Sequence, residues 1–324
     1  MSGILTMGES LGLLRAHGIG TLEHLASMDV AIGGAEGNVA IGLARLGTPA
    51  TWVGVVGDDG LGQRVVRELR GQGVRVIARV NPTAPTAVML KENPTAGLTR
   101  VTYFRSAGAG RTLEPSDVEA LERDGELTGI QLVHVTGITP ALSESAAAAV
   151  RALVDAAHRH GIPVSFDVNH RSRLWTDRDP VPVYRDLVAS SDIVFAGEDE
   201  AALVVGGTDS TVALSDDELI AGLAALGPRE VVLKRGAAGA TAQDGDETLS
   251  VPAVPVSVVD SVGAGDAFVA GYLAERVAGE PLAVRLQTAV RAGAFACTGS
   301  GDWESAPRRR DLDLLGASGD PVIR

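Results

Sequence analysis

The sequence predicts an α/β fold with a central, mostly parallel sheet that helices cover on both faces. Short apolar runs alternate with amphipathic helical stretches along most of the 324 residues, which is the pattern of repeated strand–helix–strand units. Hydrophobic residues make up 45% of the chain and charged residues 21%, so the chain can bury a large core. Two strand-rich segments interrupt the alternation and predict a second, smaller sheet.

The central sheet is predicted from seven short apolar runs, whose length fits buried strands. They lie at Ile4–Gly8, Thr51–Val56, Val74–Ala78, Ile130–Val135, Val164–Asp167, Ile193–Ala196 and Val231–Lys234. Two further runs, Ala240–Ala242 and Glu247–Val251, are expected to form a hairpin after the last of them.

Eight helices are expected between and after these strands. They lie at Gly37–Leu46, Leu61–Gly71, Pro115–Arg123, Ser143–His160, Glu198–Val205, Asp216–Leu226, Ala264–Ala278 and Leu282–Thr298. One start is well marked, because Ser215 precedes three acids at 216–218. A hydroxyl cap and early carboxylates suit the exposed N–H groups and the positive end of a helix.

The segments at about 11–33 and 84–106 break the strand–helix alternation. In the second, Val88–Leu90 and Val101–Phe104 carry β-branched and aromatic residues and flank a turn-like stretch at Glu92–Gly97. We expect the two segments to pair into a small lid sheet over one end of the central sheet; two independent surface hairpins are the alternative. The expected organisation is one domain over residues 1–310 that includes both lid segments, followed by a C-terminal tail at 311–324.

Composition and charge narrow the function classes. The net charge of −13 argues against a nucleic-acid binder, which normally carries a basic face. No apolar run approaches the roughly 20 residues of a membrane span, and the N-terminus is too short and polar for a signal peptide. We therefore expect no membrane association and a cytoplasmic location.

Two rare residue types are also informative. The single cysteine, Cys297, excludes an intramolecular disulfide, and its apolar neighbours predict a buried, inert thiol. Only Lys91 and Lys234 of the 28 basic residues are lysines, which indicates a compositional preference for arginine.

The segment Asp260–Phe268, D-S-V-G-A-G-D-A-F, carries the chemistry. An extended run ends at residue 260, and a helix is expected from Ala264. Glycines at 263 and 265 let the backbone approach a ligand closely, and a helix N-terminus offers unpaired N–H groups and partial positive charge to an anion. Asp266 lies in the first turn, where its carboxylate can accept a proton from an alcohol.

This turn therefore predicts both parts of a phosphoryl transfer. The amides of Gly263, Ala264 and Gly265 can stabilise charge on a γ-phosphoryl group, while Asp266 deprotonates the acceptor hydroxyl. A plain glycine turn with an aspartate at a helix start is the alternative. The nine-residue string is far more specific than an isolated G-x-G.

The string resembles the C-terminal signature of the ribokinase-like, PfkB-type carbohydrate kinases, D-[TS]-x-G-A-G-D-x-F. The N-terminal signature of that family is matched at Gly33–Ala40, Leu43–Gly47 and Val53–Gly60. The resemblance covers about residues 4–307. It implies a three-layer α/β/α sandwich with a β-sheet lid, and an ATP-dependent sugar kinase. It also implies sugar contacts from Gly33, Gly34, Asn38 and Asp260.

The same resemblance predicts a nucleotide and metal side. Lys234, Gly236 and Gly239 match the family's K-x-G-x-x-G turn, which would contact ATP together with Gly263 and Gly265. By itself this stretch is equally consistent with a turn in a hairpin. Glu200 matches the acid of an N-x-x-E element that organises Mg²⁺ largely through water, although Gly197 replaces the usual asparagine. The resemblance also leaves open a monovalent cation such as K⁺.

Other nucleotide-binding motifs are absent from the sequence. There is no G-x-x-x-x-G-K-[ST], which excludes a P-loop kinase. No strand–G-x-G-x-x-G–helix unit occurs near the start, which disfavours a Rossmann dehydrogenase.

Three residues favour an acidic sugar as the substrate. Tyr103 and Arg105 lie on the second lid segment, and Arg171 follows the strand at 164–167, at the edge where open α/β sheets bind ligands. Arginine is well suited to a carboxylate or phosphate. The Y-x-R and D-x-N-x-R-x-x-L-W patterns resemble the 2-keto-3-deoxygluconate kinases. Leu13 replaces an aspartate with which many ribokinase-like members bind sugar hydroxyls.

The best expectation is a kinase that phosphorylates a terminal hydroxyl of 2-keto-3-deoxygluconate. Fructokinase-like members also carry D-x-N-x-R-x-x-L-W, so a kinase of a neutral sugar such as a ketose or ribose stays open, as does one of a nucleoside. A sugar- or nucleotide-binding regulator without activity is the alternative from a different class. Edge strands of the lid are expected to support a homodimer.

Overall fold

A nine-stranded sheet forms the centre of the computed structural model, which describes residues 3–95, 97–208 and 214–315. The strand order is β13-β12-β11-β10-β9-β8-β1-β4-β5, and all neighbours are parallel except β11–β12 and β12–β13. The bounds are β1 Gly3–Met7, β4 Ala50–Gly57, β5 Arg75–Asn81, β8 Ile130–Thr136, β9 Val164–Asp167, β10 Ile193–Gly197, β11 Glu230–Lys234, β12 Ala240–Asp244 and β13 Glu247–Val251.

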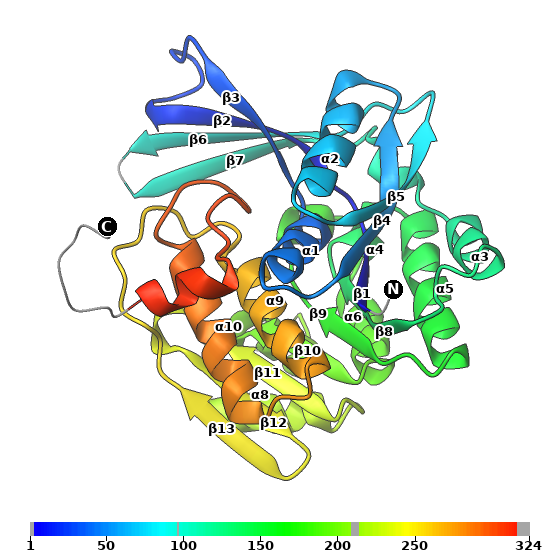
Figure 1. The fold of residues 1–324 in the computed structure, drawn as a ribbon, viewed down its shortest axis with the longest axis vertical. Coiled ribbons are helices and arrows are strands. Elements are labelled where there is room, and N and C mark those ends of the chain that lie inside the picture. Colours follow the sequence, from blue (N-terminus) through cyan, green and yellow to red (C-terminus); the bar gives the residue numbers. More distant parts are fainter. Residues whose placement is uncertain (1–2, 96, 209–213, 316–324) are drawn as a thin grey trace.

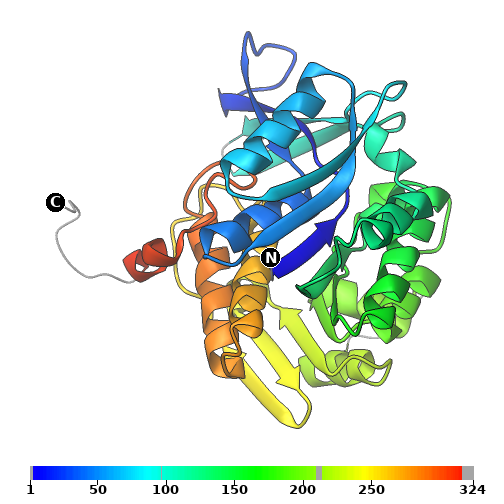
Figure 2. The ribbon, with the colours of Figure 1, turned by 45° about the vertical axis from the view of Figure 1, so that its right-hand side comes forward.

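Helices cover both faces of this sheet (Figures 1 and 2). One face packs against α1 Ala35–Arg45, α2 Gly60–Gly71, α9 Ala264–Val277 and α10 Leu282–Ala296. The other packs against α3 Pro115–Arg123, α4 Thr139–Leu142, α5 Glu144–Arg159, α6 Val181–Ala189, α7 Glu198–Gly206 and α8 Asp216–Ala224. Successive strand residues point to opposite faces, so Ile4 and Leu5 lie in different cores. The predicted three-layer sandwich is confirmed.

The two segments predicted as a lid form one four-stranded sheet of order β3-β2-β6-β7. Its strands are β2 Leu11–Ile19, β3 Met28–Gly33, β6 Val88–Thr95 and β7 Leu98–Phe104. Because β2 pairs in parallel with β6, with Leu13 opposite Met89 and Arg15 opposite Lys91, the segments depend on each other. Independent hairpins are therefore excluded, and Figure 1 shows the lid projecting from one end of the central sheet.

The structure differs from the prediction in four main places. The short helix α4, Thr139–Leu142, was not expected. Helix α6 was not expected, because Pro180, Pro182 and β-branched residues have low helix propensity. Its prolines lie at the start, where proline is tolerated, and its apolar side is buried. The stretch 252–263 contains no strand, so the Gly263–Gly265 turn follows irregular backbone. Cys297 is only partly buried rather than buried.

Four short 3₁₀ helices complete the described elements. They are η1 Ala109–Thr112, η2 Ser172–Leu174, η3 Gly236–Ala238 and η4 Arg309–Leu314. The tail predicted at 311–324 thus begins inside η4, and its residues 316–324 lie outside the described part. Among the described helices, none combines the length and the apolar character needed to cross a bilayer.

The strand order places a natural crevice between β1 and β8. The chain fills the sheet from β1 outward to β4 and β5, then returns to the other side of β1 and continues through β8 to β11. Ligands of open α/β sheets bind outside the carboxyl ends of the strands where the order reverses in this way. In this chain the lid rises from the same edge, because β2 follows the end of β1 after three residues.

Candidate active site

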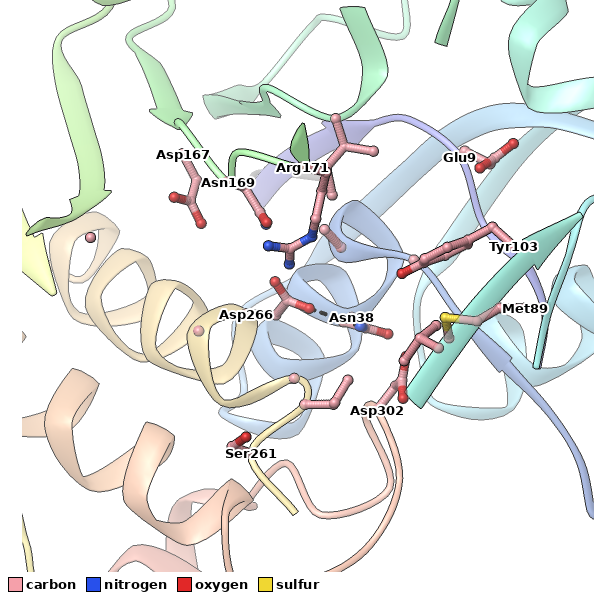
Figure 3. A pocket seen from close by; sticks show the side chains of 18 of the residues that line it. Glu9, Asn38, Met89, Tyr103, Asp167, Asn169, Arg171, Ser261, Asp266 and Asp302 are labelled. Atoms are coloured by element: carbon pink, nitrogen blue, oxygen red, sulfur yellow. Dashed lines mark hydrogen bonds between the residues drawn. The ribbon is translucent and has the colours of Figure 1, made fainter. Parts of the chain in front are cut away.

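A cavity of about 640 Å³ lies between the lid and the carboxyl ends of the central strands (Figure 3). The lid contributes Met89 and Tyr103, the loop after β9 contributes Arg171, and the first turn of α9 contributes Asp266. Figure 3 shows Arg171 extending toward Asp266 from one side, while Tyr103 and Met89 approach from the lid. The crevice predicted by the topology is thus a polar, partly enclosed compartment.

Asp266 faces this cavity. Its Oδ2 accepts a hydrogen bond of 2.8 Å from Nδ2 of Asn38 on α1, and no ion pair engages the carboxylate within the described residues. Burial raises the pKa of Asp266 to about 7; the Asn38 hydrogen bond opposes this rise and the nearby Asp167 adds to it. A carboxylate with a pKa near neutrality and room for an alcohol beside it can act as a general base.

In the turn before Asp266, the N–H groups of Gly263 and Gly265 have no partner among the described residues, while that of Ala264 donates to the Ser261 oxygen at 3.3 Å. Gly263 caps α9 in the left-handed region with φ of 77°, and no side chain caps this helix end. A Cβ on Gly263 would lie 1.7 Å from the backbone oxygen of Asp302, whereas a Cβ on Gly265 would meet nothing within 4 Å. The first N–H groups of a helix have no intrahelical partner, so this end of α9 suits an anion.

A second cavity of about 580 Å³ lies on the other side of this turn. It is lined by Gly236 and Gly239 after β11 and by apolar side chains of the 253–258 stretch and α10. Cys297 also lines it, and burial raises the pKa of its thiol. Lys234, Ser261 and Gly265 line both cavities. The two compartments therefore meet at the start of α9.

Glu200 is held by its surroundings rather than free to bind a metal directly. Its Oε1 accepts from the His170 N–H at 2.8 Å and its Oε2 accepts from the Gly197 N–H at 2.7 Å. Lys234 lies 3.8 Å away and also donates to Asp167 at 2.7 Å. Burial opposes ionisation of Glu200, but Lys234 and the two N–H groups outweigh it and lower its pKa.

Glu200 and its neighbours are compatible with Mg²⁺ only if water molecules lie between the ion and the carboxylate. The described chain holds no group of three or more His, Cys, Asp or Glu side chains arranged as a metal site. Mg²⁺ keeps several of its waters and commonly relies on substrate phosphates, and Glu200 still has lone pairs for such waters. Water-mediated binding beside a polyphosphate is therefore compatible with this strand end.

Arg105 is already paired on the lid side of the first cavity. Its guanidinium donates to Oε2 of Glu9 and stacks on Tyr103, 5.0 Å from the ring centroid. Glu9 is 2% exposed and its Oε1 has no partner among the described residues. Burial raises the pKa of Glu9, although Arg105 opposes the rise. A ligand carboxylate at Arg105 would thus compete with, or follow protonation of, Glu9.

Two residues predicted at the substrate do not line the cavity. Asp260 instead forms an ion pair with Lys91 on β6. Gly33 packs beside Asp302, since a Cβ there would lie 2.7 Å from Oδ2 of that residue. Gly34 does line the cavity, with φ of 134°.

The other predicted substrate residues surround the cavity, and the structure adds several that the patterns did not indicate. Those that were predicted are Gly34, Asn38, Tyr103, Arg105 and Arg171. Those that were not are Glu9, Met89 and Asp302, whereas Asp167 and Asn169 belong to the D-x-N-x-R-x-x-L-W pattern without having been assigned individually. Asn169 is the one non-glycine residue with positive φ in the described chain, which no local motif signals.

Comparison with known proteins places this site in a family. The family model described as "pfkB family carbohydrate kinase" matches residues 13–309. A 2-dehydro-3-deoxygalactonokinase of Haloferax volcanii is 32% identical over 306 residues, with 92% of each chain covered. A 2-dehydro-3-deoxygluconokinase of Bacillus subtilis is 32% identical over 314 residues, which cover 95% of this chain and 93% of that protein.

A neutral-sugar relative and a solved structure agree with this family. A fructokinase of Klebsiella pneumoniae is 33% identical over 292 residues, covering 86% of this chain and 90% of that protein. A putative ribokinase II of E. coli, solved with ATP and Mg²⁺, superposes with a TM-score of 0.86 at 26% identity, covering 97% and 99% of the two chains. The chain belongs to the pfkB family of carbohydrate kinases and has the ribokinase-like fold.

Proposed function

We propose that this sugar kinase transfers the γ-phosphoryl group of ATP to the terminal hydroxyl of a sugar acid, with 2-keto-3-deoxygluconate (2-dehydro-3-deoxygluconate) as the best candidate. One observation carries the proposal. Gly265 and Lys234 line both cavities, so a phosphate chain lying in the second compartment would meet, at the start of α9, an acceptor beside Asp266.

The proposed mechanism assigns a task to each part of the turn. Asp266 takes the proton of the acceptor hydroxyl, and the N–H groups of Gly265 and its neighbours stabilise the charge on the transferred group. Lys234, Gly236 and Gly239 border the compartment for ATP. Glu200 would hold Mg²⁺ through water beside the phosphates of ATP, and the ion would neutralise part of their charge. Closure of the lid would exclude water from the acceptor.

Two cations support an acidic acceptor. Arg105 and Arg171 line the first cavity from opposite sides, and Arg171 is exposed rather than paired with a carboxylate in the described chain. The relatives named for 2-dehydro-3-deoxy sugar acids agree with such an acceptor. The fructokinase relative supports a second candidate, a neutral ketose. We also propose that K⁺ activates phosphoryl transfer by this protein.

The proposal is tested by measuring ATP consumption with sugar acids, ketoses, pentoses and nucleosides as acceptors, with and without K⁺. The highest kcat/KM is expected for a 2-keto-3-deoxy sugar acid, and mass spectrometry of the product is expected to show phosphate on the terminal hydroxyl. A clear preference for a neutral ketose would favour the second candidate. Absence of turnover with every acceptor would favour a non-catalytic binding protein.

Arg105→Ala is expected to lower kcat/KM for the sugar acid by about 10- to 100-fold, the range of a lost charge-assisted hydrogen bond. A neutral analogue of equal size should lose less than about 3-fold, since it makes no such bond. Steady-state kinetics with both acceptors measure the difference. Arg100→Ala is a matched control, because Arg100 lies on the same strand, is 57% exposed and pairs with Glu92 outside the cavity. Equal losses for both acceptors would contradict a carboxylate contact.

The lid also supports the expected homodimer. Strand β7 is the edge of the lid sheet, and Leu98 and Phe104 on it are 53% and 61% exposed. Exposed edges and apolar side chains are suited to pairing with a second copy. Sedimentation equilibrium is expected to give twice the chain mass, and Phe104→Asp is expected to weaken association by at least about 10-fold. A wild-type monomer at micromolar concentration would contradict the dimer.

A further inference from the structure

The two lysines of the chain each lie close to two carboxylates. Lys91 and Lys234 are the only lysines in a sequence with 28 basic residues. Each reaches two carboxylates beside the first cavity: Lys234 lies near Asp167 and Glu200, and Lys91 near Asp260 and Asp302. Lys234 begins the turn at 234–239, which was already assigned to ATP. Lys91 is on the lid, is 2% exposed and has no role in the mechanism above.

The partners of Lys91 belong to two segments that converge on the catalytic turn. Its Nζ donates to Oδ2 of Asp260 at 2.5 Å and to Oδ1 of Asp302 at 3.4 Å. Asp260 begins the turn, and its Oδ1 accepts from the N–H of Val262 at 3.1 Å. Asp302 follows α10, and its backbone oxygen lies 1.7 Å from the position that a Cβ on Gly263 would take.

Electrostatics explains why a cation is needed between these loops. Burial raises the pKa of Asp302 to about 6 even though Lys91 opposes the rise. Without the ammonium, two buried carboxylates would face each other with no cation between them, which is strongly unfavourable. An ammonium is a compact charge with three donors, whereas guanidinium needs a flat slot. This geometry accounts for a lysine in a chain that otherwise uses arginine.

We propose that Lys91 is a positioning residue that fixes the Gly263–Gly265 turn from the lid. The ammonium holds Asp260 at one end of the turn and Asp302 against Gly263, so the backbone amides keep their direction. The same bonds tie the lid strand β6 to the turn. The inference rests on the proposed site of phosphoryl transfer. Because Lys91 lines the first cavity and not the second, it should affect the transfer step much more than the binding of ATP.

Lys91→Met is expected to lower kcat by about 10²-fold, the effect of a displacement of about 1 Å at a reacting centre. The KM for ATP should stay within about 3-fold of wild type, since ground-state binding is not altered. Lys91→Met/Asp302→Asn removes the surplus buried charge and keeps the test valid if the single variant unfolds. Lys91→Ala with added propylammonium, compared with sodium at equal ionic strength, should regain part of the lost kcat.

A matched control is Arg15→Met. Arg15 is opposite Lys91 in the lid register and also bridges to the loop after α10, through an ion pair with Glu304 at 3.4 Å. Unlike Lys91, Arg15 forms no ion pair with Asp260. This variant should keep at least about half of the wild-type kcat, as expected for a partly exposed ion pair. Equal losses in Arg15→Met and Lys91→Met would reduce Lys91 to a general lid contact and overturn the proposal.

Two further outcomes distinguish this inference from the proposed function. A loss confined to the KM of the sugar would make Lys91 a substrate contact and not a positioning residue. A normal kcat in Lys91→Met, with Asp266→Asn inactive, would overturn the role of Lys91 and leave the transfer site intact. Wild-type turnover in Asp266→Asn would instead remove the transfer site itself, whatever Lys91 does.

Discussion

Replacing Asp266 with asparagine is expected to lower kcat by roughly 10²–10⁴-fold, the range for loss of a general base. The KM values for ATP and sugar should change little, because asparagine has nearly the same shape and can still accept the 2.8 Å hydrogen bond from Asn38. A coupled assay of ADP release measures the loss. Turnover at the wild-type rate would show that another group removes the proton.

The pH dependence of the wild-type enzyme provides the companion measurement. The pKa of Asp266 is raised to about 7 in the folded protein, so the carboxylate is increasingly protonated below that pH and kcat/KM should fall there. The residual rate of Asp266→Asn should not show this fall. Burial disfavours the ionised form of Asp266, so between pH 3.8 and about 7 the folded protein binds a proton that the unfolded chain has lost. The contribution of Asp266 to the free energy of unfolding therefore falls as the pH rises through this range. At pH 8 the variant should therefore be at least as stable as wild type.

Gly263→Ala is expected to lower kcat by roughly 10²–10³-fold, the range for loss of an aligned oxyanion donor. The alanine would need φ of 77° and would place its Cβ 1.7 Å from the backbone oxygen of Asp302, so the turn must move. The left-handed backbone alone costs about 1–2 kcal/mol for a residue with a Cβ. Thermal unfolding should show this cost as a lower Tm.

Gly265→Ala is the contrasting variant at the same turn. A Cβ there meets nothing within 4 Å, so the Tm should stay near the wild-type value. The added methyl group would project where the two cavities meet, and the expected change is a higher KM for ATP or a lower kcat. If Gly263→Ala kept both normal Tm and normal kcat, the geometry assigned to the turn would be incorrect.

Most of the fold could be predicted because local pattern and burial agree. The strand Val164–Asp167 and the helix Pro115–Arg123 were predicted with the bounds that the structure has. Helix α6 could not be, because its stability comes from tertiary burial of Tyr184, Leu187 and Val188 rather than from propensity. The order of the lid strands required pairing between segments about 75 residues apart, which periodicity alone does not determine.

The residues of the candidate site were predictable where their positions depend on local sequence, and not where they depend on distant contacts. Asp266 and the Gly263–Gly265 turn are contiguous in sequence, so one motif carried their local geometry. Glu9 lies beside Arg105 only because the lid folds back over β1, and nothing near Glu9 in sequence indicates that contact. Asp260 was predicted at the sugar from its motif, but its side chain turns to Lys91, a partner 169 positions away.

The meeting of two compartments at Gly265 has a consequence for inhibitor chemistry. A single molecule that joins a nucleoside to a sugar acid through a short chain of phosphates would fill both spaces at once. Because the two halves would then bind as one ligand, its affinity should exceed that of either half alone. The number of phosphates in the molecule that binds most tightly would indicate the distance between the nucleotide and the acceptor hydroxyl.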